Sequence, residues 1–142
     1  MYSILELAEH GNLLDFVNNK PMNDSLVWFY FRQLLSAVKC IHDADYCHWD
    51  IKLENLLLDS NFNLKLSEFG FSSLKSKDNK LLFTMKGTLG YMAPEIFQGK
   101  GYNGELTDVF ALGVVLFGMI FGWPPFRCAD LKDPYYRLIC SN

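Results

Sequence analysis

The stretch His48-Trp49-Asp50-Ile51-Lys52-Leu53-Glu54-Asn55 places an acid, a base and an amide at short spacing, and a second acid follows in Glu68-Phe69-Gly70. An aspartate can orient a hydroxyl group, a lysine can meet phosphate charge, and carboxylate and amide oxygens suit Mg²⁺. Between the two segments, apolar residues 56–58 and 64–66 are joined by the turn-forming residues 59–63. The pattern predicts a β-hairpin flanked by the loops of a phosphoryl-transfer site.

Helical spacing of apolar residues dominates much of the remaining chain. Residues 13–17 and 25–43 each predict an amphipathic helix, and Asp24 or Ser25 is expected to cap the longer one. A strongly apolar helix is expected from Thr107 onward.

Three further segments complete the expected organisation. Residues 2–5 are expected to end a strand, residues 68–95 to form a long functional loop, and residues 133–139 to form a last helix. The predicted fold class is mostly α-helical with one small β-hairpin.

The composition restricts the classes of protein and partner. Half of the 142 residues are hydrophobic, which excludes global disorder. The formal net charge is −3 and basic residues form no long patch, so nucleic acid is not expected as a partner. The 4 cysteines have neither metal-binding nor disulfide-framework spacing, and no secretory signal opens the chain, which favours a cytoplasmic protein.

Residues 109–126 carry no charge and approach the length of a membrane-spanning helix. Gly113, Gly118 and Gly122 interrupt this stretch, and Trp123-Pro124-Pro125 ends its helical part. A buried core helix without membrane contact is therefore expected, and a membrane span is the less favoured alternative.

Taken together, these motifs resemble the eukaryotic protein kinase family, in particular the larger, helical lobe (C-lobe) of a Ser/Thr kinase. The segment from His48 to Asn55 resembles the catalytic loop, and Glu68-Phe69-Gly70 resembles the metal-binding motif that opens the activation segment. The remaining matches are the end of the activation segment, the central helix of the lobe and the turn after it: Gly87-Thr88-Leu89-Gly90-Tyr91-Met92-Ala93-Pro94-Glu95, Asp108 with Gly113, and Gly122-Trp123-Pro124-Pro125-Phe126.

The resemblance covers essentially the whole chain and implies one partial kinase domain, residues 1–142. Residues 1–12 would form the hinge between the lobes and residues 13–142 an incomplete C-lobe, with the smaller lobe (N-lobe) absent.

The resemblance implies catalytic and metal-binding roles for four residues. Asp50 would accept or orient the proton of the substrate hydroxyl, and Lys52 would neutralise the moving phosphoryl group. Asn55, also part of the catalytic set, and Glu68 would hold Mg²⁺ through oxygen. A lysine two positions after the aspartate is the form found in Ser/Thr kinases.

An ATP site is implied by the same resemblance. Backbone groups of Glu6 and Ala8 would meet the adenine ring, and Leu57 would form the floor beneath it. In the activation segment, Thr84 stands where the family's phosphorylation site commonly lies.

Other residues would organise the site. Thr88 would pack against Asp50 and Lys52, while Glu95 would normally pair with an arginine of the last helices. The residues with structural roles would be His48, Phe69 and Asp108. Asp108 would either cap its helix or brace the backbone of the catalytic loop.

Two substitutions in the central site depart from the family pattern. Trp49 stands where regulated kinases have an arginine that pairs with a phosphorylated residue, so phosphorylation of Thr84 is expected to switch little. Glu68 replaces the usual aspartate, and its carboxylate lies one carbon–carbon bond, about 1.5 Å, further from the backbone. Weaker Mg²⁺ binding is expected, because Mg²⁺ demands near-ideal geometry.

The chain is expected to transfer no phosphate on its own, because half of the nucleotide cleft would be missing. One hypothesis is a catalytic-domain fragment of a protein serine/threonine kinase, which would transfer the γ-phosphate of ATP to a protein substrate with Mg²⁺. The alternative is a catalytically inactive, pseudokinase-type module that binds a protein partner. A helical interaction protein without nucleotide chemistry is a third, remote possibility.

Overall fold

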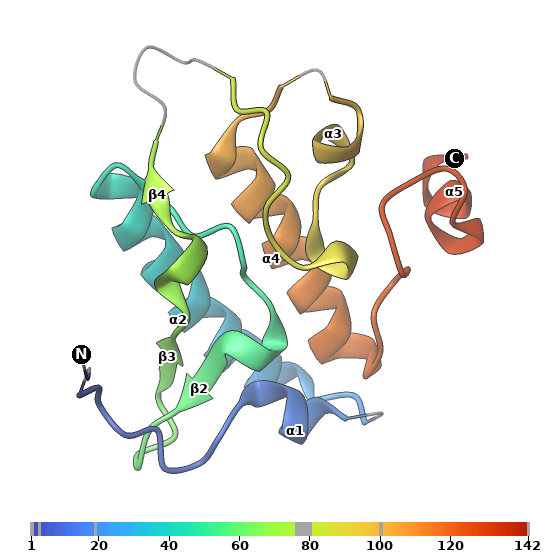
Figure 1. The fold of residues 1–142 in the computed structure, drawn as a ribbon. Helices are drawn as coiled ribbons and strands as arrows, with labels where there is room; N and C mark the ends of the chain where they lie inside the picture. Colours follow the sequence, from blue (N-terminus) through green and yellow to red (C-terminus); the bar gives the residue numbers. More distant parts are fainter. Residues whose placement is uncertain (1, 3, 19, 76–80, 100, 142) are drawn as a thin grey trace.

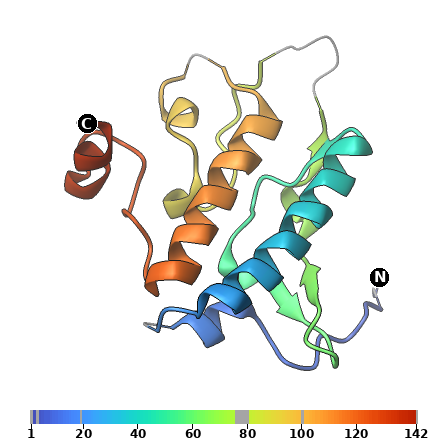
Figure 2. The ribbon, with the colours of Figure 1, turned by 180° about the vertical axis from the view of Figure 1, so that it is seen from behind.

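Two long helices form the centre of the fold. The computed structural model describes residues 2, 4–18, 20–75, 81–99 and 101–141. Helices α2 (Asp24–Asp43) and α4 (Gly104–Phe121) pack against each other, and both views show them running side by side (Figures 1 and 2). Helix α5 (Pro134–Cys140) lies at the edge of the molecule (Figure 1). The predicted predominance of helix is confirmed.

The remaining elements are short and surround the two central helices. They are α1 (Leu13–Val17), β1 (Tyr46–Cys47), η1 (Leu53–Asn55), β2 (Leu56–Leu58), β3 (Leu64–Leu66), η2 (Phe69–Phe71), β4 (Ser73–Leu74), η4 (Leu89–Tyr91) and α3 (Pro94–Phe97), where η denotes a 3₁₀ turn. Strands β2 and β3 pair antiparallel with Leu57 opposite Lys65, which confirms the predicted hairpin. The hairpin packs against α2 through β3 and against α1 through β2.

The longest predicted helix, α2, is amphipathic as its periodicity indicates. It buries Val27, Tyr30, Leu34 and Val38, which recur at helical spacing, against the hairpin and α4. Its N-cap is Asn23, whose side chain accepts a hydrogen bond from the Leu26 N–H at 2.9 Å. The prediction of Asp24 or Ser25 as the cap was therefore wrong, because both lie inside the helix.

Helix α4 begins at Gly104, earlier than the predicted Thr107. The Asn103 side chain accepts from the N–H groups of Glu105 and Leu106 and so starts the helix before its apolar periodicity begins. The helix has 18 residues and is apolar enough to cross a membrane by length and composition. Half of it is buried inside the fold, as in the core helix that the sequence favours.

The strand expected at residues 2–5 is not formed by its described members. Tyr2, Ile4 and Leu5 are exposed and pair with no described strand. A strand needs a hydrogen-bonding neighbour, and none of the described residues supplies one there. Backbone hydrogen bonds to the hairpin begin at His10, whose N–H donates to the Leu58 carbonyl at 3.1 Å, and Asn12 forms an isolated bridge with Leu57.

A second two-stranded ladder was not predicted. Strands β1 and β4 pair antiparallel, with Tyr46 opposite Leu74 and Cys47 opposite Ser73. These strands are two residues long and far apart in the sequence, so no local pattern announces them. The ladder joins the start of the catalytic loop to the start of the long functional loop.

Candidate active site

Asp50 lies at the centre of a buried hydrogen-bond network. Its carboxylate accepts a hydrogen bond from Thr88 Oγ1 at 2.6 Å and forms an ion pair with Lys52 Nζ at 2.9 Å. Asn55 Nδ2 donates to the Asp50 carbonyl at 2.8 Å and to its carboxylate at 3.1 Å. Lys52 Nζ also donates to Thr88 Oγ1 at 2.8 Å, which closes the network. Three residues from two separate loops therefore meet at the carboxylate of Asp50.

This network decides the charge of Asp50. Burial is the largest single influence and favours the neutral acid, but hydrogen bonds from Thr88, Lys52 and Asn55 and the charge of Lys52 together outweigh it. The pKa of Asp50 consequently lies below its ordinary value. A carboxylate with a low pKa is a weak base, so it is better suited to orienting a hydroxyl group than to removing a proton early in a reaction.

Helix α4 holds the backbone of the catalytic loop through Asp108. The side chain of Asp108 is almost fully buried and accepts from the N–H groups of His48 at 2.9 Å and Trp49 at 2.8 Å. It also meets His42 Nε2 at 2.9 Å. Of the two roles expected for Asp108, the structure shows the bracing contact, because the cap of α4 is Asn103.

His48 links the catalytic loop to the strand that precedes Glu68. Its Nε2 lies 2.9 Å from the Ser67 carbonyl, while its Nδ1 accepts from the Asp50 N–H at 3.2 Å. This pattern requires the proton on Nε2. Burial lowers the pKa of His48, which keeps the ring neutral. Phe69 packs edge-on against the same ring, with centroids 5.0 Å apart.

The residues expected to bind nucleotide and metal line one open cleft of about 850 Å³. They are Glu6, Ala8, Asn55, Leu57 and Glu68. Sequence reasoning did not include Lys65, which also lines this cleft and pairs with Glu6 at 3.0 Å. The available signal was the pair Leu64-Lys65 in the predicted hairpin, which places a lysine on its exposed face.

The donor set in this cleft suits a hard cation. Asn55 uses its amide nitrogen toward Asp50, so its oxygen remains available to a ligand. Glu68 is exposed, and its carboxylate has no hydrogen-bond or ion-pair partner within the described part of the chain. Its backbone is left-handed, with φ of 63°. Oxygen ligands from an amide and a carboxylate fit Mg²⁺.

A second group with metal-ligating side chains does not fit a metal. His42, Cys47 and Asp108 bring their ligand atoms within 4.8 Å of one another. Both carboxylate oxygens of Asp108 already accept hydrogen bonds, and burial raises the pKa of the Cys47 thiol to about 12. A neutral thiol is a poor metal ligand, so this group is structural.

The activation-segment residues separate into two groups. Thr88 reaches Asp50, as described above, whereas the Thr84 side chain is exposed. The Thr84 carbonyl accepts a hydrogen bond from the Tyr102 hydroxyl. Glu95 lies on α3, and its side chain pairs with no cation among the residues that the structure covers.

A smaller groove of about 360 Å³ runs from Thr88 toward the end of α4. Its polar lining includes Glu54, which accepts a hydrogen bond from the Tyr91 hydroxyl at 3.3 Å. Burial, followed by the charge of Glu54, raises the pKa of Tyr91, so this hydroxyl stays protonated and donates. Both residues lie inside the motifs quoted from the sequence, but neither of them was predicted to have a role in the site.

Comparison with known proteins identifies the fold. The family described as "Protein kinase domain" matches residues 1–141. The chain belongs to the protein kinase family. This finding confirms the resemblance on which the site was predicted, and protein kinases as a family use ATP and Mg²⁺ and act on protein substrates.

Similar proteins from a plant and a mammal are serine/threonine kinases. The chain is 41% identical over 140 residues to "CBL-interacting serine/threonine-protein kinase 10" of Arabidopsis thaliana, covering 97% of this chain and 29% of that protein. It is 42% identical over 137 residues to "Testis-specific serine/threonine-protein kinase 2" of Mus musculus, covering 93% of this chain and 38% of that protein. The chain thus spans about a third of the length of the curated relatives that it matches. Both of these relatives are named as serine/threonine kinases.

Proposed function

We propose that this chain forms the hinge and most of the C-lobe of a protein serine/threonine kinase. In the longer protein, the γ-phosphate of ATP passes to a Ser or Thr hydroxyl of a protein substrate. The observation that carries this proposal is the network in which Thr88, Lys52 and Asn55 converge on the buried carboxylate of Asp50. Catalysis of phosphoryl transfer consists mostly of such positioning.

The reacting groups follow from this geometry. Asp50 receives the hydroxyl hydrogen of the substrate while the hydroxyl oxygen bonds to the γ-phosphorus and the bond to the leaving ADP oxygen breaks. Lys52, held between Asp50 and Thr88, meets the charge of the moving phosphoryl group. The low pKa of Asp50 keeps it anionic, so it orients the hydroxyl before it accepts the proton.

The cleft supplies the cofactor sites in this proposal. Asn55 and Glu68 would hold Mg²⁺, which neutralises phosphate charge when bound. Glu6 and Ala8 would face the adenine ring from the hinge, above Leu57. The ion pair between Lys65 and Glu6 would fix the hinge against the hairpin.

The chain by itself is proposed to be inactive. Its cleft is open, and the described residues line it from the hinge, α2 and the hairpin side only. None of these described residues forms a Gly-rich loop over the phosphates. Without such a cover, water enters the site and the phosphates are held from one side alone.

The test is radiolabelled phosphate transfer from Mg²⁺-ATP to a Ser-containing peptide, measured on the longer native protein and on this chain. We expect transfer by the longer protein, and a loss of about 10³-fold when Asp50 is replaced in Asp50→Asn, from the typical value of a positioned base. Asp43→Asn, on the exposed end of α2, is the matched control. Equal transfer by wild type and Asp50→Asn would contradict the proposal.

A second candidate function is a non-catalytic module that binds a protein partner. It is favoured by the exposed, unpartnered carboxylate of Glu68 and by the tryptophan at position 49. Absence of both nucleotide binding and transfer in the longer protein, with transfer gained in the double variant Trp49→Arg/Glu68→Asp, would favour this function over the first.

A further inference from the structure

Trp49 lies in an apolar cluster that joins the catalytic loop to the end of the activation segment. The cluster consists of Cys47, Trp49, Ala93, Ile96 and Tyr102. The indole is 8% exposed and meets the Tyr102 ring edge-on, with centroids 5.4 Å apart. Ala93 and Ile96 belong to the segment that follows Thr88, so the indole is a contact between two loops that sequence alone leaves separate.

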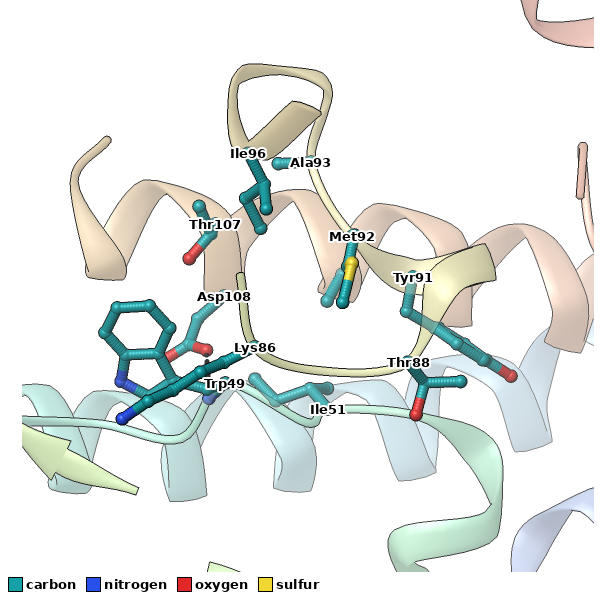
Figure 3. A pocket seen from close by; sticks show the side chains of 11 residues that line it. Trp49, Ile51, Lys86, Thr88, Tyr91, Met92, Ala93, Ile96, Thr107 and Asp108 are labelled. Atoms are coloured by element: carbon teal, nitrogen blue, oxygen red, sulfur yellow. Dashed lines mark hydrogen bonds between the residues drawn. The ribbon is translucent and has the colours of Figure 1, made fainter. Parts of the chain in front are cut away.

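Lys86 lies over the ring of the Trp49 indole. Its Nζ lies 5.6 Å from the centroid of the Trp49 ring, and Figure 3 shows the two side chains next to each other beside Asp108. The next residue, Gly87, has φ of 108°, and a Cβ there would lie 2.5 Å from the Trp49 carbonyl oxygen. The backbone before Thr88 is therefore pressed directly onto the catalytic loop at Trp49.

Two features of Trp49 are unfavourable by themselves. Its φ of 73° is in the left-handed region, which a bulky side chain rarely adopts. Its indole N–H is buried without a hydrogen-bond partner in the described structure. Such features persist only where the surroundings over-determine them. Here the surroundings are the hydrogen bond from the backbone N–H of Trp49 to Asp108 and the contacts of the indole with Tyr102 and Lys86.

We propose that the Trp49 indole, held between Tyr102 and Lys86, fixes residues 82–92 against the catalytic loop without any phosphate group. Thr88 stands two residues after Lys86 and binds Asp50 and Lys52, so fixing this segment also positions the site. Thr84 is exposed, and no described arginine lies in the cluster to pair with a phosphate there. Only the catalytic role of residues 82–92 rests on the proposed function. The packing of this segment against Trp49 does not depend on catalysis.

Hydrogen exchange of the chain, followed by mass spectrometry, tests this inference without an activity assay. Trp49→Arg puts a charged guanidinium in place of the indole in the apolar cluster, where the neighbouring Asp108 carboxylate already accepts from two backbone N–H groups, and we expect exchange of residues 82–92 to rise about tenfold. Exchange of the hairpin, residues 56–66, should remain unchanged and reports that the fold persists. Trp28→Arg, at an exposed tryptophan of α2, is the matched control and should leave both segments unchanged.

Two further variants keep the inference open to refutation if Trp49→Arg unfolds. Lys86→Ala removes the cation that lies over the indole and should raise exchange of residues 82–92 about threefold with the hairpin unchanged. Thr84→Glu should change neither segment in the wild-type background. Unchanged exchange of residues 82–92 in Lys86→Ala, or slower exchange in Thr84→Glu, would overturn the inference.

Discussion

The catalytic loop and the cleft beside it differ in how many of their polar side chains have partners within the chain. Around Asp50, the donors Thr88, Lys52 and Asn55 are all in place, and Asp108 holds the loop backbone from α4. In the cleft, the Glu68 carboxylate is exposed and has no partner in the described part of the chain. A loop whose polar groups are paired internally keeps its shape without a ligand, whereas an unpaired side chain such as Glu68 takes its final geometry from what binds there.

The largest effect is expected from removing the brace of the catalytic loop. Asp108→Ala leaves the buried N–H groups of His48 and Trp49 without an acceptor, and we expect the free energy of unfolding to fall by about 3 kcal/mol. Urea denaturation of the chain measures this change. Asp43→Ala, which breaks an exposed pair with Lys39, should leave the midpoint unchanged. Equal midpoints for Asp108→Ala and wild type would show that the loop does not depend on α4.

A smaller effect is expected at the contact between the activation segment and the catalytic loop. Thr88→Val removes the hydroxyl that donates to Asp50 and accepts from Lys52, so the free energy of unfolding should fall by about 1–2 kcal/mol. Thr88→Ser keeps the hydroxyl and serves as the control. Thermal unfolding of the three proteins gives the comparison. A loss as large in Thr88→Ser would assign the effect to the methyl group instead.

The charge of Asp50 should appear as a pH dependence of stability. Because the folded pKa of Asp50 is lowered, its contribution is present above the unfolded pKa, about 3.9, and is lost as the pH falls toward the folded pKa. Asp50→Asn should therefore differ most from wild type above pH about 4 and converge with it at lower pH. Urea midpoints measured from pH 3 to 7 provide the difference, in which other carboxylates cancel. A difference in midpoint between the two proteins that stays constant across this range would mean that folding does not favour the ionised form of Asp50.

The smallest effect on stability, and the sharpest test of the cleft, is expected at Glu68. Its side chain is exposed, so Glu68→Gln and Glu68→Asp should each change the free energy of unfolding by less than about 0.5 kcal/mol. Water-proton relaxation with Mn²⁺ as the probe should show tighter binding in Glu68→Asp, by about threefold, and weaker binding in Glu68→Gln. Identical Mn²⁺ binding in all three proteins would remove Glu68 from the metal site.

Local patterns in the sequence predicted the elements that carry the site. The apolar spacing predicted α1 and α2, and the pair of apolar runs predicted the hairpin of β2 and β3. The N-cap of α2 and the start of α4 were missed because Asn23 and Asn103 precede the apolar pattern. The prediction of a strand at residues 2–5 was wrong for its described residues, because a segment with strand propensity forms a ladder only where a neighbouring strand pairs with it.

The contacts of the site were partly predictable. The resemblance to the protein kinase family implied that Thr88 would meet Asp50 and Lys52, and the structure shows these contacts. The pairing of Lys65 with Glu6 and of Tyr91 with Glu54 had no local signal. Each joins residues whose distance is set by the packing of the hairpin or of the activation segment.

Short-range patterns were enough to specify the helices, the hairpin and the kinds of side chain available to the site, because periodicity and turn chemistry act within a few residues. Tertiary packing alone brings Asp108 to the catalytic loop and places the Trp49 indole between Tyr102 and Lys86. Those contacts close long loops and depend on burial, which no short window of sequence contains.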